Sequence, residues 1–281
     1  MLRLIALALA LVPLALAAGT AAAGGGTGSS PGVMTGWDGT LDAARSVRYV
    51  ALPVGSTTTV AAVRTSDGRM LRYGTIRGGF GVPIVAYDGT TEGVSRDGRT
   101  LVLADIGADR QRTRFAVLST TPLRLRKSVS LRGLWAFDAL SRDARTLYAV
   151  QYLGTGPNPR YNVRAVSLVT GRLLGGPIVD KREPDEEMNG APWARVRSAD
   201  GAWAYTFYAK PNGTAFVHAL DTAHRRAFCV DLPWHSSTRR LATVRLSLAD
   251  GGRALVLARP GGSRLAVVDT STFKVRALKK P

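Results

Sequence analysis

Cysteine is nearly absent from this sequence, since the only one is Cys229 in the segment RRAFCVDLP. A single cysteine cannot form an internal disulfide, so the fold must depend on the packing of its core. Histidine is also scarce, with three residues, and none belongs to a zinc motif such as H-E-x-x-H. The G-x-S-x-G motif of serine hydrolases is missing too. These absences favour a protein that is not an enzyme.

Long apolar runs are missing as well, except at the N-terminus. The first residues, MLRLIALALALVPLALAAGTAAAGGG, contain one arginine, an apolar run and then small residues suited to cleavage. This is the pattern of a secretory signal peptide. A retained membrane anchor is the alternative, although the apolar run is shorter than the roughly 20 residues that a spanning helix needs. We expect a signal peptide at 1–23, a flexible linker at 24–40 and a folded domain at 41–281.

Acidic residues are few: 20 stand against 38 lysines and arginines, which gives a formal charge of +18. A charge of this size bears on partners rather than on the fold. For a secreted or extracytoplasmic protein without a transmembrane span after cleavage, the partner would be an unknown protein, a glycan or an anionic envelope component. No nucleic-acid-reading module is recognisable, so we expect no nucleic acid. We expect a monomer.

What the sequence does contain is an internal repeat. Its copies are SRDGRTLVLA from Ser95, SRDARTLYAV from Ser141, SADGAWAYTF from Ser198 and the slightly longer SLADGGRALVLA from Ser247. Asp-Gly favours a tight turn, because aspartate bonds the nearby backbone and glycine accepts positive φ. The apolar run that follows predicts a strand beginning directly after the turn.

A second repeat alternates with the first and predicts a hairpin of two short strands around a polar turn. Its five copies lie at 59–76, 114–131, 162–179, 215–232 and 264–280. Together the two repeats predict four antiparallel strands in about 50 residues, which is the unit of a β-propeller blade. We therefore expect an all-β fold, a β-propeller of five four-stranded blades. A propeller of six blades, one of four blades with an irregular cap, and a β-sandwich are the alternatives.

The Ser-x-Asp-Gly turn, the strand after it and the hairpin VVDTSTFKV at 267–275 resemble those of the WD40-like and YncE-like (YVTN) propellers. The resemblance extends over about residues 47–280 and implies the architecture, with almost no information on activity. The sequence departs from the strict WD40 pattern, because no strand ends in Trp-Asp.

Three residues are candidates for a ligand-binding site at the mouth of the central channel. Counting three residues back from each repeat serine gives Glu92, Asp138, Arg195 and Val244. Equivalent positions on innermost strands should point the same way around the axis. We therefore expect Glu92, Asp138 and Arg195 to lie together, either as a polar binding site or as salt bridges between blades.

A second candidate is an acidic loop in this basic protein. Five carboxylates fall within eight residues: Asp180, Glu183, Asp185, Glu186 and Glu187. Crowded carboxylates suit Ca²⁺, although the spacing is not that of an EF-hand. A solvated loop that pairs with the surplus of arginines is the alternative, so no cofactor is expected unless this loop holds Ca²⁺.

The sequence thus favours a secreted or cell-envelope β-propeller that acts as a binding or interaction module, with an unknown ligand. The alternative is a channel-metal hydrolase of the lactonase kind, for which Glu92, Asp138, Asn189 and Asp185 could supply metal ligands.

Overall fold

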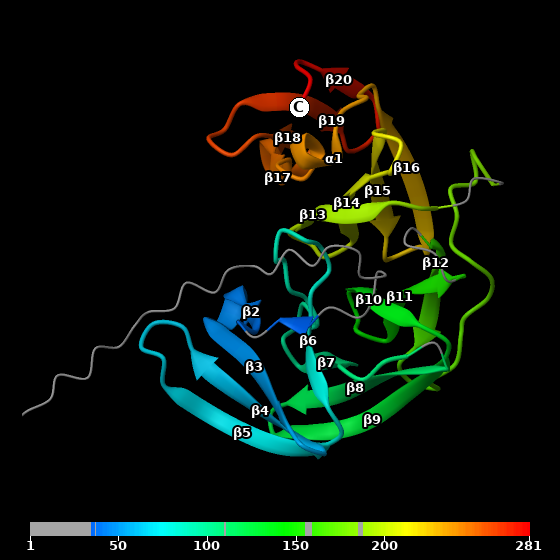
Figure 1. The fold of residues 1–281 in the computed structure, drawn as a ribbon. Helices are drawn as coiled ribbons and strands as arrows, with labels where there is room; N and C mark the ends of the chain where they lie inside the picture. The colour runs from blue at the N-terminus through cyan, green and yellow to red at the C-terminus, as the bar shows by residue number, and fades with distance from the viewer. Residues whose placement is uncertain (1–34, 37, 110, 155–158, 185–187) are drawn as a thin grey trace, which may run out of the picture.

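The computed structural model describes residues 35–281 except 37, 110, 155–158 and 185–187. Antiparallel strands form five sheets, which follow one another along the chain around an arc (Figure 1). Apart from β1, which joins the second sheet beside β6, neighbouring strands in each sheet are consecutive in sequence, from the centre of the arc outward. The predicted all-β propeller is therefore confirmed.

The strands of the five sheets have the following bounds. The first sheet holds β2 (Thr40–Asp42), β3 (Val47–Val54), β4 (Thr57–Arg64) and β5 (Met70–Arg77). The second holds β1 (Thr35–Gly36), β6 (Phe80–Pro83), β7 (Thr100–Asp105), β8 (Arg112–Thr120) and β9 (Leu123–Arg132). The third holds β10 (Trp135–Leu140), β11 (Thr146–Leu153) and β12 (Arg160–Ser167). The fourth holds β13 (Ala191–Arg197), β14 (Trp203–Ala209), β15 (Ala215–Asp221) and β16 (Arg226–Leu232). The fifth holds β17 (Arg245–Ala249), β18 (Ala254–Ala258), β19 (Arg264–Asp269) and β20 (Val275–Ala277).

Helices are short in the described part of the chain. They are α1 (Thr238–Leu241) and the 3₁₀ turns η1 (Ala43–Arg45) and η2 (Asp250–Gly252). Strands β1 and β2 begin inside the segment expected to be a linker, so the sheets start a few residues before the expected boundary at 41. The third sheet has three strands instead of four, and beyond β12 it continues only as isolated bridges, such as Val163 with Ile178.

The repeated turn has the same hydrogen bonds in three sheets. The hydroxyl of Ser95, Ser141 or Ser198 lies 2.5–2.6 Å from Oδ1 of the aspartate two residues later. The same hydroxyl accepts a bond from the N–H that opens the next strand, at 2.8–3.0 Å. Side-chain hydrogen bonds thus hold the turn together, which explains why serine and aspartate recur together.

The fourth copy of the repeat has a different register from the expected one. Ala249 stands opposite Ala254 across its turn, just as Ser141 bonds Thr146 across the turn of the third sheet. Ala249 therefore takes the serine position, and Ser247 lies two residues earlier on β17. The residue three positions before the turn is then Leu246 rather than Val244, which is buried.

Four hydrophobic cores hold the sheets together, each between two consecutive sheets. Strand β7 shows why: Leu101 and Leu103 face the first sheet, whereas Val102 and Ala104 face the third. Both faces are buried, so the strand reads as a continuous apolar run. One fully buried aromatic side chain represents each core: Tyr49, Phe115, Tyr148 and Phe207.

The ring of sheets is open between its last and first members. In the described part of the chain, no core joins the fifth sheet to the first, and these sheets form the two ends of the arc in Figure 1. The N-terminal strand β1 does not close the ring either, because it pairs with β6 of the second sheet.

Candidate functional site

The structure brings Glu92, Asp138 and Arg195 together near the centre of the arc. The guanidinium of Arg195 donates from Nε to Glu92 Oε1 at 3.0 Å and from Nη1 to Asp138 Oδ1 at 2.7 Å. Its Nη2 also donates to the carbonyl of Asp138 at 2.7 Å. Asp138 and Arg195 belong to the third and fourth sheets, and Glu92 belongs to a segment that connects two strands of the second, so this ion-pair group links these three sheets.

The group differs from the expected channel mouth in two respects. Glu92 lies in the segment between β6 and β7 rather than on an innermost strand. The side chains are also buried, with exposed fractions of 1% for Arg195, 7% for Glu92 and 5% for Asp138. Buried opposite charges are stable only when paired, and here they are paired with each other.

The electrostatics of Arg195 fit this pairing. Burial acts to lower the pKa of its guanidinium, but the charges of Glu92 and Asp138 outweigh it, so the pKa is raised. Arg195 therefore stays charged and already occupies the space between both carboxylates. A metal ion held by Glu92 and Asp138, as the hydrolase alternative needs, would have to displace it.

Arg197 is a further member of this group that the sequence analysis missed. Its Nη1 lies 3.3 Å from Glu92 Oε2, and its Nη2 donates to the carbonyls of Leu140 and Gly201, both at 3.1 Å. The signal was available, because residues two apart on a strand point to the same face. Arg197 is therefore the expected companion of Arg195.

Three buried polar atoms in or near this group have no hydrogen-bond partner within the described residues: Asp138 Oδ2, Arg197 Nε and His218 Nε2. Thr206 stands between Arg195 and His218 in the cross-strand register of the fourth sheet. Burial lowers the pKa of His218 to about 4, although the charge of Asp138 acts in the opposite direction. This histidine is therefore neutral at physiological pH, and it belongs to the core.

The acidic loop is only partly within the described residues. Asp185, Glu186 and Glu187 lie outside them. Asp180 is buried and binds Arg182 Nη2 at 2.6 Å and the N–H of Cys229 at 2.8 Å, whereas Glu183 is exposed. Burial acts to raise the pKa of Asp180, but these hydrogen bonds outweigh it and lower the pKa. Where the chain is described, no three His, Cys, Asp or Glu residues are placed to hold a metal ion.

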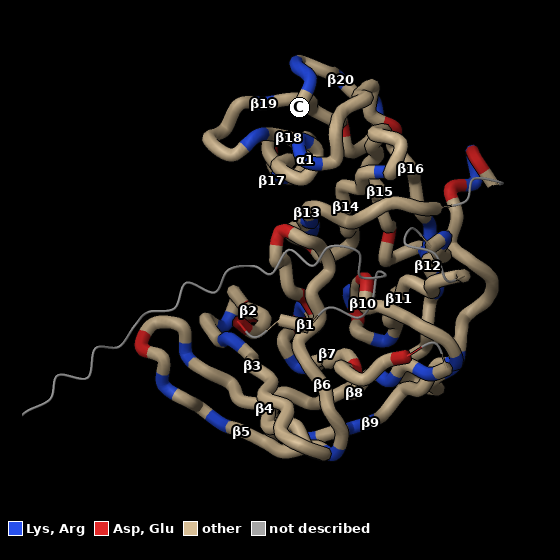
Figure 2. The backbone as a smooth tube through the Cα atoms, viewed as in Figure 1, with Lys and Arg blue, Asp and Glu red and all other residues tan. Residues whose placement is uncertain are grey.

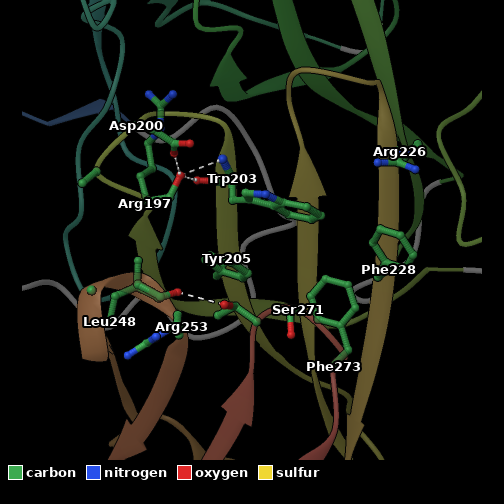
Figure 3. Close-up of a pocket in the computed structure, with 15 residues that line it drawn as sticks. Arg197, Asp200, Trp203, Tyr205, Arg226, Phe228, Leu248, Arg253, Ser271 and Phe273 are labelled. Atoms are coloured by element: carbon green, nitrogen blue, oxygen red, sulfur yellow. Dashed lines mark hydrogen bonds between the residues drawn. The ribbon is translucent and has the colours of Figure 1, made fainter.

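An open cleft of about 920 Å³ lies between the fourth and fifth sheets, on the side of the repeated turns. We call it the seam cleft. Its aromatic lining consists of Trp203 and Tyr205 on β14, Phe228 on β16 and Phe273 in the turn before β20 (Figure 3). The ring centroids of Phe228 and Phe273 are 4.7 Å apart, and those of Trp203 and Phe273 are 5.7 Å apart. Tyr205 is buried beneath, and the other three rings are half-buried.

Three arginines surround these rings: Arg197, Arg226 and Arg253. Arg226 pairs with Asp221 at 2.9 Å but keeps half of its side chain exposed. Arg253 is exposed and donates from Nε to the carbonyl of Asp250. Asp200 is the one acidic residue of the described lining. The seam cleft therefore combines an aromatic floor with a rim of three arginines. Arg197 and Arg226 also pair with carboxylates outside the lining, and Arg253 donates to a carbonyl.

The seam cleft differs from the corresponding region between the third and fourth sheets. There the hydroxyl of Tyr148 donates to the carbonyl of Thr222 at 2.7 Å, and the hollow is smaller, at about 410 Å³. The residue that opens the strand after the turn is Thr100, Thr146 or Ala254 in the other copies, but Trp203 in this one. The sequence signal was thus SADGAW where the preceding copies have SRDGRT and SRDART.

Lysine and arginine positions occur along all five sheets (Figure 2), as expected from their spread along the sequence.

Comparison with solved structures identifies similar folds. The β-propeller domain of Cps50 (Swd1) from Myceliophteria thermophila matches with a TM-score of 0.51 and 14% identity, over 88% of this chain and 71% of that one. A putative 6-phosphogluconolactonase from Bacteroides uniformis matches with a TM-score of 0.45 and 13% identity, over 83% and 67% of the two chains. A putative TolB from Agrobacterium tumefaciens matches with a TM-score of 0.42 and 13% identity, over 82% and 76%.

At such low identity the likeness shows the fold alone, which is that of a β-propeller. No protein-family model and no curated protein matches the chain. In the part of the chain that the structure describes, no helix has the length and hydropathy required to cross a membrane.

Proposed function

We propose that this protein is an extracytoplasmic β-propeller that acts by binding, and that its ligand occupies the seam cleft. The proposal combines the signal-peptide pattern at 1–23 with a fold that commonly serves as a binding or interaction module. One observation carries it: Trp203 interrupts the repeat at a position where two other copies have threonine, and it lines the seam cleft together with two phenylalanines and three arginines.

The buried ion-pair group of Glu92, Asp138 and Arg195 then has a structural role, and the binding site lies elsewhere. Its polar atoms bind each other across three sheets. This corresponds to the salt bridges between blades that the sequence left open as an alternative. Arg195 lies near the C-terminal end of β13, and the turn directly after β13, at 198–200, lines the seam cleft.

The experiment uses a small probe that matches both parts of the cleft, the anionic aromatic dye 8-anilinonaphthalene-1-sulfonate. Its fluorescence titration should show one saturable site on the native protein. Trp203→Thr should weaken binding at that site at least tenfold, because the variant removes an aromatic side chain from the cleft. Threonine is the residue at this position in two other copies of the repeat. Tyr73→Thr, at an exposed position on the first sheet, is the matched control and should leave the affinity unchanged. Equal binding by the Trp203 variant would refute the proposal.

A further inference from the structure

We infer that the seam cleft binds an acidic peptide segment of a partner protein, with one apolar side chain among the aromatic rings and carboxylates on the arginines. This inference rests on the proposed function, because it names the class of ligand for the same site.

The floor of the cleft suits an apolar anchor. Trp203, Phe228 and Phe273 are half-buried, so each keeps part of its ring surface open. Covering apolar surface gains roughly 25 cal/mol per Å². Tryptophan, tyrosine and arginine are also the residues that most often dominate protein–protein binding energies, and all three types line this cleft.

The rim of the cleft suits carboxylates. Arg226 uses Nη2 for Asp221, and Arg253 uses Nε for the carbonyl of Asp250. A guanidinium has five N–H donors in a planar fork that matches a carboxylate. The described residues provide no partner for the Nη groups of Arg253, so donors remain for a ligand. A chain with a formal charge of +18 also attracts acidic partners at long range.

The shape of the cleft favours a peptide over a glycan. The rings of Trp203 and Phe273 meet at 63°, and those of Phe228 and Phe273 at 31°. They therefore form a concave apolar surface rather than a single flat platform on which a sugar ring stacks. Figure 3 shows these rings facing Leu248 and Arg253 across the cleft. Its volume of about 920 Å³ lies in the range of well-formed ligand sites, ~300–1,000 Å³.

The test measures fluorescence anisotropy with fluorescein-labelled nonapeptide pools. In the first pool, aspartate or glutamate flanks one central Leu, Phe or Trp. A second pool has serine in place of the anchor, and a third has lysine in place of the acidic residues. Only the first pool should bind, and its affinity should fall as NaCl is raised, because the contacts are charged. Polygalacturonate serves as the anionic glycan probe.

Two variants locate the binding. Trp203→Thr should weaken the first pool at least tenfold, and Arg253→Gln about fivefold. The matched control is Arg142→Gln, since Arg142 is an exposed arginine of the equivalent turn in the third sheet. It should leave the affinity unchanged.

Each outcome decides a different point. If the first pool binds the native protein and the Trp203 variant equally, or does not bind at all, the peptide inference is overturned. If polygalacturonate binds in a Trp203-dependent manner and the peptides do not, the ligand is an anionic glycan, and the proposed function survives. If the dye also fails to bind, both the proposed function and the inference are wrong.

Discussion

Ala144 occupies a backbone conformation that alanine rarely adopts. Its φ is 54°, where the equivalent Gly98 and Gly201 have 61° and 72°. The sequence predicted positive φ at both glycines, and the structure confirms it. The Asp-Ala copy of the repeat therefore keeps the same turn at the cost of a left-handed alanine.

We predict that Ala144→Gly stabilises the protein by about 0.5–1 kcal/mol. The relief of backbone strain at positive φ outweighs the greater conformational freedom that glycine gives the unfolded chain. Gly98→Ala should instead destabilise it by more than about 1 kcal/mol. A Cβ at position 98 would overlap the Arg45 guanidinium and the Asp42 carboxylate. Urea unfolding of both variants checks this. A loss of stability in Ala144→Gly would contradict the assignment of the turn.

His218 should give the protein a distinct pH dependence. Burial lowers its pKa to about 4, whereas the unfolded chain should titrate near 6.5. Between these values only the unfolded state takes up the proton. Stability is therefore complete above about pH 6.5 and falls by about 3 kcal/mol as the pH drops to 4.

The variant His218→Gln should flatten the unfolding free energy between pH 6.5 and 4, as measured by urea titrations across that range. His235→Gln, at an exposed position, is the control and should keep the slope of the native protein. If both variants keep the slope, His218 does not cause it.

The buried ion pairs predict a non-additive mutant cycle. Arg195→Met leaves buried Asp138 without its charged partner and leaves Glu92 with Arg197 alone. This should cost about 3–5 kcal/mol. The triple variant Arg195→Met/Glu92→Gln/Asp138→Asn should cost less, since it removes the charges together. Thermal unfolding of both proteins at pH 7 compares them, and an equal or larger loss in the triple variant would refute the charge argument.

At the scale of the element, three copies of the repeated turn share the same side-chain hydrogen bonds, and the fourth copy has a different register. Ser141 bonds both Asp143 and the N–H of Thr146. Ser247 lies on β17, two residues before the turn position. The same serine in the sequence thus has two different structural roles.

Ser141→Ala should cost about 1 kcal/mol, because a half-buried N–H loses its acceptor and the turn its bridge. Ser247→Ala should change stability by less than about 0.5 kcal/mol, since its side chain is exposed. Differential scanning calorimetry of the pair measures this. Similar losses of stability in both variants would show that the serine of the fourth copy forms the same hydrogen bonds as in the other copies.

At the scale of the whole molecule, the open ring makes the sheets unequal. The fourth sheet packs on the third through one core and on the fifth through another. The first and fifth sheets each belong to only one core in the described part of the chain. The seam cleft therefore lies between a doubly supported sheet and a singly supported one.

Amide hydrogen exchange followed by mass spectrometry should reveal this difference. Strands β17–β20 should exchange faster than β13–β16, because regions with fewer buried contacts open at lower free energy. Peptides from the first sheet should resemble those from the fifth. Equal protection of all five sheets would show that a further element covers the ends of the arc in solution.

The sequence by itself determined the all-β class, the five-fold repetition and the approach of Glu92, Asp138 and Arg195, because periodicity and equivalent repeat positions are local signals. Only the tertiary structure decided that the triad is buried, that Glu92 reaches it from a loop, and that the last repeat is shifted by two residues. It also decided that the ring stays open and that the seam cleft forms. Trp203, Phe228 and Phe273 come from two sheets, and a sequence pattern carries no information on how two sheets meet at a seam.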